Sequence, residues 1–157
     1  MEKKILNDFC FHKPKTLDEA LVLIDKYQEN GLLMEGGSEV IPNMKSLVVT
    51  PDHIISLKHI PEFDYITYTP GKGLHIGPSC TLTKVEYDPD VQTVYPSLYM
   101  GVHGMSNTNI HNISTVTGNI CYAVPSADTA APLLTLNAEL SVKSVDGERK
   151  VPITELF

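Results

Sequence analysis

Two glycine-containing turns carry the residue types that could bind an anionic group. In "MEGGSEV", Gly36 and Gly37 follow a short apolar run and precede Ser38. Glycines at such a turn let backbone N–H groups approach a ligand with no side chain in the way. In "STVTGN", residues 114–119 offer hydroxyls, a glycine and a side-chain amide. Both turns therefore supply hydrogen-bond donors that suit phosphate oxygens.

An isolated carboxylate, Asp128, follows the second turn. In dinucleotide sites such a carboxylate commonly accepts hydrogen bonds from ribose hydroxyls, so the two donor turns and Asp128 together indicate a nucleotide with a pyrophosphate. Two structural alternatives stay open. Either glycine turn could simply connect two strands, and Asp128 could cap the helix that "TAAPLL" is expected to begin.

The segment from Ser114 to Asp128 combines few charges with many turn formers. The scarcity of charge predicts burial. Gly118-Asn119 and Pro125, in contrast, predict an irregular backbone. We therefore expect a segment that is buried but irregular.

Short elements before the first turn must hold it in place. Thr16 and Glu19 form a capping box at the start of "TLDEALVLI", whose apolar residues recur at helical spacing. Gly31 is expected to end this helix in the left-handed conformation. The run "LLME", residues 32–35, predicts a buried strand that leads directly into the glycine turn.

Further elements are interleaved without strict alternation. Three strands and two helical segments are expected, in chain order, at residues 53–57, 65–68, 74–77, 81–89 and 91–102. The second and third of these strands form a hairpin, and Pro96 predicts a break within the last helical segment. Asp146-Gly147, between two strand-like runs, predicts another hairpin. This mixture favours the α+β class.

The composition is that of an ordinary compact chain. Of its 157 residues, 42% are apolar and 20% are charged, which is enough to bury a core in one unit. A formal net charge of −7, without a cluster of Lys or Arg, argues against nucleic acid or an anionic membrane as the main partner. Neither a membrane-spanning run nor a signal-peptide core is visible, so a cytoplasmic location is expected.

Metal and thiol chemistry have little support in the sequence. Cys10, Cys80 and Cys121 form no C-x-x-C pair, so neither a disulfide framework nor a thiolate metal site is expected. The six histidines lack the i, i+4 spacing of a helical metal site. No metal site is predicted, and no side chain is assigned a catalytic acid or base role.

Two long segments carry a family resemblance. "EGGSEVIPNMK" and "NTNIHNISTVTGNICYAVPSADTAAPLLTLNAEL" resemble the FAD-contacting segments of the flavin subunit of molybdenum hydroxylases, relatives of xanthine dehydrogenase and carbon monoxide dehydrogenase. The flanking "KPKTLDEAL", "PDHIISLKHIPEF", "LHIGPSCTLTKVE" and "GERKVPITELF" resemble further landmarks in the same order. The resemblance implies a PCMH-type FAD-binding fold, with a small N-terminal αβ subdomain at residues 1–57 and a larger mixed α+β subdomain at residues 58–157.

The resemblance also implies a set of FAD-binding residues. It places one pyrophosphate loop at residues 33–40 and the other at residues 114–119, with a ribose-binding aspartate downstream and Ile120 and Cys121 beside the flavin. The cofactor-binding residues implied in this way are Leu33, Met34, Glu35, Gly36, Gly37, Ser38, Glu39, Val40, Ser114, Thr115, Gly118, Asn119, Cys121 and Asp128. Cys121 could instead be a small buried hydrophobe, the common fate of a free cysteine.

Three positions depart from the family pattern. Thr117 replaces the first of two adjacent glycines, and its branched side chain is expected to crowd the pyrophosphate or to forbid a positive φ. His111 replaces a basic residue and is expected to be mostly neutral at pH 7 unless its surroundings raise its pKa. The sequence ends at Phe157, so the family's C-terminal domain is expected to be absent or supplied by a separate chain.

The function that the resemblance implies is electron transfer through FAD. Electrons would arrive from a [2Fe-2S] subunit, substrate would be hydroxylated on a molybdopterin-binding subunit, and NAD is a possible acceptor. The isolated chain is expected to show no hydroxylase activity. Two alternatives are a shortened flavin-subunit fragment that acts as an interaction module without FAD, and a different PCMH-type FAD oxidoreductase.

Overall fold

The computed structural model describes residues 6–124 and 127–156 and has the expected α+β architecture. Its strands are β1 (Cys10–His12), β2 (Gly31–Met34), β3 (His53–Ser56), β4 (Ile66–Thr69), β5 (Gly73–Ile76), β6 (Glu139–Ser144) and β7 (Gly147–Pro152). Its helices are α1 (Leu17–Tyr27), α2 (Val40–Lys45), α3 (Leu82–Tyr87), α4 (Pro89–Val94), α5 (Pro96–His103), α6 (Thr108–His111), α7 (Val116–Cys121) and α8 (Ala130–Thr135). The expectations for Pro125 and Phe157 fall outside the described residues.

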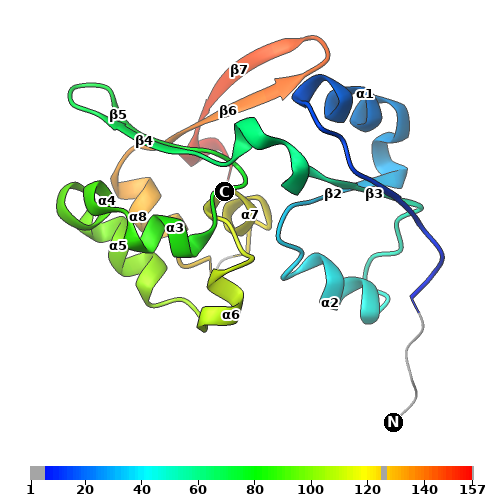
Figure 1. Cartoon of the computed structure of the whole chain (residues 1–157), viewed down its shortest axis with the longest axis horizontal. Coiled ribbons are helices and arrows are strands. Elements are labelled where there is room, and N and C mark those ends of the chain that lie inside the picture. Colours follow the sequence, from blue (N-terminus) through cyan, green and yellow to red (C-terminus); the bar gives the residue numbers. More distant parts are fainter. Residues whose placement is uncertain (1–5, 125–126, 157) are drawn as a thin grey trace.

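The N-terminal part is a parallel sheet in the order β1-β3-β2. The central strand β3 buries Ile54 and Ile55, which are 0% and 1% exposed, and Leu32 of β2 pairs with Ile54. In Figure 1 the sheet and α2 lie at one end of the molecule, with α1 above them. Because β2 ends at Met34, its carboxyl end delivers the chain directly to Gly36 and Gly37. Ligands of open parallel sheets bind at this edge.

The capping box of α1 is present, but the predicted end of this helix is wrong. The backbone N–H of Glu19 donates to Thr16 Oγ1 at 3.2 Å, and the Glu19 carboxylate accepts from the N–H of Lys15 at 2.7 Å. The positive φ that ends the helix belongs to Gln28, with φ 41°. Gly31, with φ −104°, begins β2 instead. A single 3₁₀ turn fills the space between them, which local sequence signals did not reveal.

The helices α3 to α8 gather around the main hydrophobic core. Fully buried members include Leu82 and Val85 of α3, Val91 of α4, and Leu98 and Val102 of α5. Proline occupies the first helical position of both α4 and α5, where its missing N–H is not needed. The predicted break at Pro96 is therefore confirmed. Both predicted hairpins, β4–β5 and β6–β7, are also present (Figure 1).

The segment after Ser114 is more regular than the sequence indicates. Residues 116–121 form α7, whose N-cap Thr115 accepts a hydrogen bond from the Gly118 N–H at 2.9 Å. The predicted irregular turn at Gly118-Asn119 is wrong, because this side-chain cap makes a helical turn favourable there. Thr117 lies inside the helix and is not among the residues with positive φ, so no strain arises from its branched side chain.

Membrane insertion receives no support from the helices. None of those within residues 6–124 and 127–156 has the length and apolar character that a membrane span requires.

The end of α1 gives a prediction about stability. Gln28→Gly should raise the free energy of unfolding by up to about 1 kcal/mol, because glycine adopts a positive φ without the strain that a Cβ imposes. Glu29→Gly is the matched control, since its φ is not positive and added flexibility should only destabilise. Urea unfolding measures both. Equal destabilisation by the two variants would contradict the helix end described above.

Candidate functional site

A cavity of about 660 Å³ lies between the two turns that the sequence singled out. It brings together every predicted binding residue except Met34. It also has walls that the sequence reasoning missed, contributed by Leu32, Met105, Ser106, Ile110, Tyr122 and Val124. Pockets of a few hundred to about 1,000 Å³ are typical of small-molecule and cofactor sites. The cavity is therefore large enough for a cofactor that touches both turns.

The first turn presents free backbone donors. Within the hydrogen bonds that the described residues make, the N–H groups of Gly36, Gly37 and Ser38 have no protein acceptor. Gly37 has φ +75°, a conformation that a side chain would strain, and a Cβ there would lie 3.1 Å from Met34 Sδ. Backbone donors that no protein group satisfies are well suited to phosphate oxygens.

Gly36 holds the two turns together through a very close backbone contact. A Cβ built at Gly36 would lie 1.7 Å from the carbonyl oxygen of Ile113 and 3.2 Å from the backbone nitrogen of Ser114. Both neighbours are backbone atoms, so no side-chain rotation could make room. Glycine is therefore required at position 36 by the other turn, in addition to any role toward a ligand.

A side-chain hydrogen bond reinforces this contact. The hydroxyl of Ser114 donates to Ser38 Oγ at 2.9 Å, which joins residues 76 positions apart in the sequence. Because Ser38 accepts in this bond, its own hydroxyl hydrogen stays available to a ligand. The Ser38 hydroxyl therefore adds one donor to the free N–H groups of the first turn.

The second turn contributes in a different way from the first. The Gly118 N–H is already bound to Thr115 Oγ1, and the Asn119 N–H is bound to the Thr115 carbonyl at 3.0 Å. These two amides therefore cap and build α7 and do not point to a ligand. What remains at this side of the cavity is the Thr115 hydroxyl hydrogen and the open space beside Gly118.

Asn119 fixes the segment that carries Asp128. Its side-chain oxygen accepts from the Thr129 hydroxyl at 2.6 Å and from the Thr129 N–H at 3.3 Å. Thr129 is 0% exposed and is the N-cap residue of α8, so the proposed capping role of Asp128 is wrong. Within the described residues no hydrogen bond or ion pair engages the exposed Asp128 carboxylate at the cavity.

Three residues singled out by the sequence lie elsewhere. Met34 does not line the cavity, and its thioether packs toward Gly37. Ile120 is 3% exposed and belongs to the hydrophobic core, because its place on α7 turns it away from the cavity. Thr117 does not line the cavity either, so its side chain does not border the space in which a pyrophosphate is expected.

Two titratable groups of the cavity are shifted by partial burial. Desolvation is the largest cause that raises the pKa of Glu35, so its carboxyl keeps a proton to higher pH than an exposed glutamate. Cys121 is open to the cavity, which makes the expectation of a buried hydrophobe wrong. The cavity walls nevertheless desolvate its thiol and raise its pKa, which disfavours a reactive thiolate.

The sequence holds only weak local signals for the cavity-lining residues that were missed. Tyr122 and Val124 lie inside the quoted segment, immediately after α7, and could have been included by continuity. The Tyr122 hydroxyl also accepts from Asn43 Nδ2 of α2 at 3.3 Å, a second link across the two turns. Met105 and Ser106 belong to the link between α5 and α6, and only the folded chain reveals that this link faces the cavity.

The arrangement of the residues around the cavity defines a class of protein. A donor turn at the carboxyl edge of a parallel sheet, a second turn locked to it, and a free carboxylate around one cavity define an α+β nucleotide-binding module. The model of the family described as "FAD binding domain in molybdopterin dehydrogenase" matches residues 7–157, so the chain belongs to that family. The resemblance seen in the sequence is confirmed, and with it FAD as the cofactor of the family.

Known relatives agree with this assignment. The nicotinate dehydrogenase FAD-subunit of Eubacterium barkeri is 29% identical over 97% of this chain and 51% of its own length. A putative xanthine dehydrogenase FAD-binding subunit of Escherichia coli K12 is 33% identical over 93% of this chain and 50% of its own length. The chain thus spans about half the length of these relatives.

Solved structures give the same fold. A carbon monoxide dehydrogenase from Hydrogenophaga pseudoflava superposes with a TM-score of 0.91 at 27% identity. The superposition covers 96% of this chain and 52% of that one. The expected PCMH-type FAD-binding fold is therefore confirmed.

The close backbone contact at Gly36 predicts that a side chain at this position lowers stability. Gly36→Ala should lower the free energy of unfolding by about 1 to 3 kcal/mol, because the new methyl group overlaps the Ile113 carbonyl and forces the turns apart. Gly118→Ala is the matched control from the same cavity. Its Cβ would meet only the Thr115 hydroxyl, at 3.1 Å, and alanine favours the helix. Chemical denaturation should separate the two variants, and a Gly36→Ala chain as stable as the parent would refute the locked contact.

Proposed function

We propose that this chain holds FAD in the cavity between the two turns and serves as an electron-transfer module of a molybdenum hydroxylase. One observation carries the proposal. Among the described residues, neither the N–H groups of residues 36–38 nor the Asp128 carboxylate has a protein partner, and all of them belong to residues that line the same cavity. The backbone donors can bind the oxygens of the pyrophosphate, and the carboxylate can accept hydrogen bonds from the ribose hydroxyls. The cavity therefore has complementary groups for both the pyrophosphate and the ribose of one nucleotide.

The donor set fits the cofactor chemically. Three backbone N–H groups and the Ser38 hydroxyl face one side of the cavity, and the Thr115 hydroxyl faces it from the other. Three carboxyl groups, Glu35, Glu39 and Asp128, also line the cavity. Burial in the cavity raises the pKa of Glu35, mainly by desolvation of its carboxyl.

The residues of this chain act by binding and positioning. Bound FAD supplies the redox chemistry itself, because a flavin takes up electrons singly or in pairs. The first turn orients the pyrophosphate, Asn119 holds the segment of Asp128 in place through Thr129, and apolar walls such as Met105 and Ile110 exclude water. No general acid or base on this chain is required.

The place of the module in a larger assembly is also part of the proposal. On the family resemblance seen in the sequence, electrons would come from a [2Fe-2S] subunit that is reduced by a molybdopterin-binding subunit, and NAD is a candidate acceptor. Residues 1–57 and 58–157 would form two subdomains, each of which contributes one turn. The module would act in the cytoplasm.

Thr117 gives no support to the alternative of an interaction module without FAD, because its side chain does not line the cavity. For a different FAD oxidoreductase, a catalytic acid or base beside the flavin would be needed. Glu35 is the partly buried carboxyl of the cavity, yet nothing places it at the reactive end of a flavin. Neither alternative is favoured by a specific observation.

Asp128 provides a direct test of the ribose contact. Asp128→Ala should weaken FAD binding by about 1 to 3 kcal/mol, the usual cost of losing hydrogen bonds to a charged acceptor. Asp146→Ala removes an equal charge from the turn between β6 and β7, and should leave FAD binding unchanged. Titration with FAD, followed by flavin absorbance and fluorescence, compares the two. Equal affinities of both variants and the parent would remove Asp128 from the site.

Gly118 tests whether the ligand fills the cavity beside α7. Gly118→Val adds a branched side chain at a cavity-lining position and should abolish FAD binding in a chain that still folds by circular dichroism. Thr117→Val keeps a branched side chain at the neighbouring position that does not line the cavity, and should bind as the parent does. A folded Gly118→Val chain with parental affinity would argue for the interaction module.

A further inference from the structure

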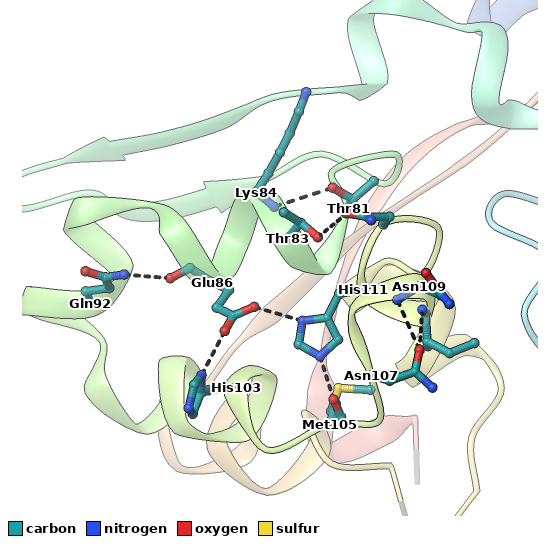
Figure 2. A network of polar contacts seen from close by, with 12 residues as sticks. Thr81, Thr83, Lys84, Glu86, Gln92, His103, Met105, Asn107, Asn109 and His111 are labelled. Carbon is teal, nitrogen blue, oxygen red and sulfur yellow. Dashed lines mark hydrogen bonds and ion pairs between the residues drawn. The ribbon is translucent and has the colours of Figure 1, made fainter.

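A buried histidine lies between two hydrogen-bond acceptors next to the cavity. His111, the last residue of α6, has a side chain that is 7% exposed. Its Nδ1 lies 2.8 Å from a carboxylate oxygen of Glu86, and its Nε2 lies 2.6 Å from the carbonyl oxygen of Met105. Figure 2 shows the imidazole ring spanning the space between these two groups.

Both contacts require the ring to donate. A backbone carbonyl oxygen can only accept, so Nε2 must carry a hydrogen. The Glu86 carboxylate also only accepts when it is ionised, so Nδ1 must carry a hydrogen as well. A neutral imidazole has one N–H and could satisfy only one of these partners. The doubly protonated, positively charged ring satisfies both.

Glu86 is held in the ionised form. Hydrogen bonding from His103 is the largest cause that lowers its pKa, and hydrogen bonding from His111 acts in the same direction against the opposing effect of burial. Each of its two oxygens bonds one histidine, since Oε1 lies 2.8 Å from Nδ1 of His103. A protonated Glu86 that donates to His111 is therefore disfavoured.

A short series of contacts connects this ion pair to the cavity. Met105, which accepts from the ring, lines the cavity, as does Ile110, the neighbour of His111 on α6. The Ile110 carbonyl accepts from the N–H groups of Ile113, at 3.1 Å, and Ser114, at 2.8 Å. Ile113 is the residue whose carbonyl touches Gly36. The ring is therefore linked, through Met105 and Ile110, to the apolar wall of the cavity and to the contact that closes the two turns.

We propose that His111 is a positively charged positioning residue, clamped by Glu86 and the Met105 carbonyl, that holds the α6 wall of the FAD cavity in its binding-competent form. The consequence for ligand binding rests on the function proposed above, whereas the charge of the ring does not. The positive charge of the imidazolium lies inside the fold and not in the cavity, because His111 does not line the cavity.

The proposal fixes the sign of a pH dependence. A ring without a hydrogen on Nδ1 would turn a lone pair toward the Glu86 carboxylate, and the clamp would weaken. Protonation of Glu86 weakens the clamp from the other side, because a neutral carboxyl accepts the Nδ1 hydrogen less strongly than a carboxylate does. FAD affinity should therefore fall toward acid pH. The contribution of ionised Glu86 to the clamp is fully present above the ordinary pKa of a glutamate. It is lost only as the pH falls through the lowered pKa of Glu86.

The other ionisable groups near the ring are few. Among the described residues, the titratable side chains joined to His111 are Glu86 of α3 and, through it, His103 of α5. Tyr99 stacks on His103 with ring centroids 5.3 Å apart. Lys84, also on α3, pairs instead with Asp64. The Glu86 carboxylate therefore balances the His111 ring directly.

Glu86→Gln separates the charge from the hydrogen bonds. The side-chain amide that this substitution introduces can donate to a neutral Nδ1 of His111 while its oxygen still accepts from His103, so every contact survives without the ion pair. Nitrogen NMR of the imidazole ring, at about pH 7, should detect two protonated nitrogens for His111 in the parent and one in Glu86→Gln. His75→Gln is the control, because His75 is exposed on β5, lies outside these contacts and does not line the cavity.

The second measurement is FAD affinity across pH. We expect the parent and His75→Gln to lose about five- to tenfold in affinity as the pH falls from about 6 through the lowered pKa of Glu86, a typical size for coupling between sites. Glu86→Gln should be nearly independent of pH in that range. A singly protonated His111 ring in the parent would overturn the proposal, and so would an equal pH dependence in Glu86→Gln.

The two proposals fail in different ways. If the parent does not bind FAD at any pH, the proposed function fails, but the NMR of the ligand-free chain still decides the state of the ring. If the parent binds FAD and the ring carries one proton, only the positioning role of His111 is rejected. Thermal unfolding of each variant shows whether lost affinity is merely lost folding.

Discussion

The backbone contact between Gly36 and Ile113 is the constraint on which the rest of the site depends. It allows the carboxyl end of β2 and the start of α7 to approach more closely than any side chain at position 36 would permit. The hydrogen bond from Ser114 to Ser38 then keeps the two turns in register. Without this approach, the N–H groups of the first turn and the Asp128 carboxylate would not border one cavity.

The rest of the fold supports that contact from both sides. The parallel sheet anchors the first turn through the buried strand β3 and its pairing with β2. On the other side, the Ser114 carbonyl accepts from the Leu82 N–H at 2.8 Å, which joins the second turn to the main helical core. The contact between Glu86 and His111 joins α3 of this core to α6 (Figure 2). Short elements, each weak alone, thus position the site by tertiary contacts.

Local patterns in the sequence were sufficient to predict most helices and strands and the types of residue that form the site. Capping residues, proline at helix starts and Asp-Gly at a hairpin act over a few residues, so they can be read without the fold. The end of α1 at Gln28, the helical state of Gly118 and the wall formed by Met105 could not be read in this way. Each depends on a 3₁₀ turn, a side-chain cap or a long-range approach that competes with local preference.

In the proposed function, both turns bind one molecule of FAD. Amide NMR of the isotope-labelled chain, recorded while FAD is added, follows each turn separately. The signals of Gly36, Gly37 and Ser38 should shift together with those of Thr115 and Asp128, with one common affinity. Shifts confined to one turn, or different affinities for the two groups of signals, would contradict it.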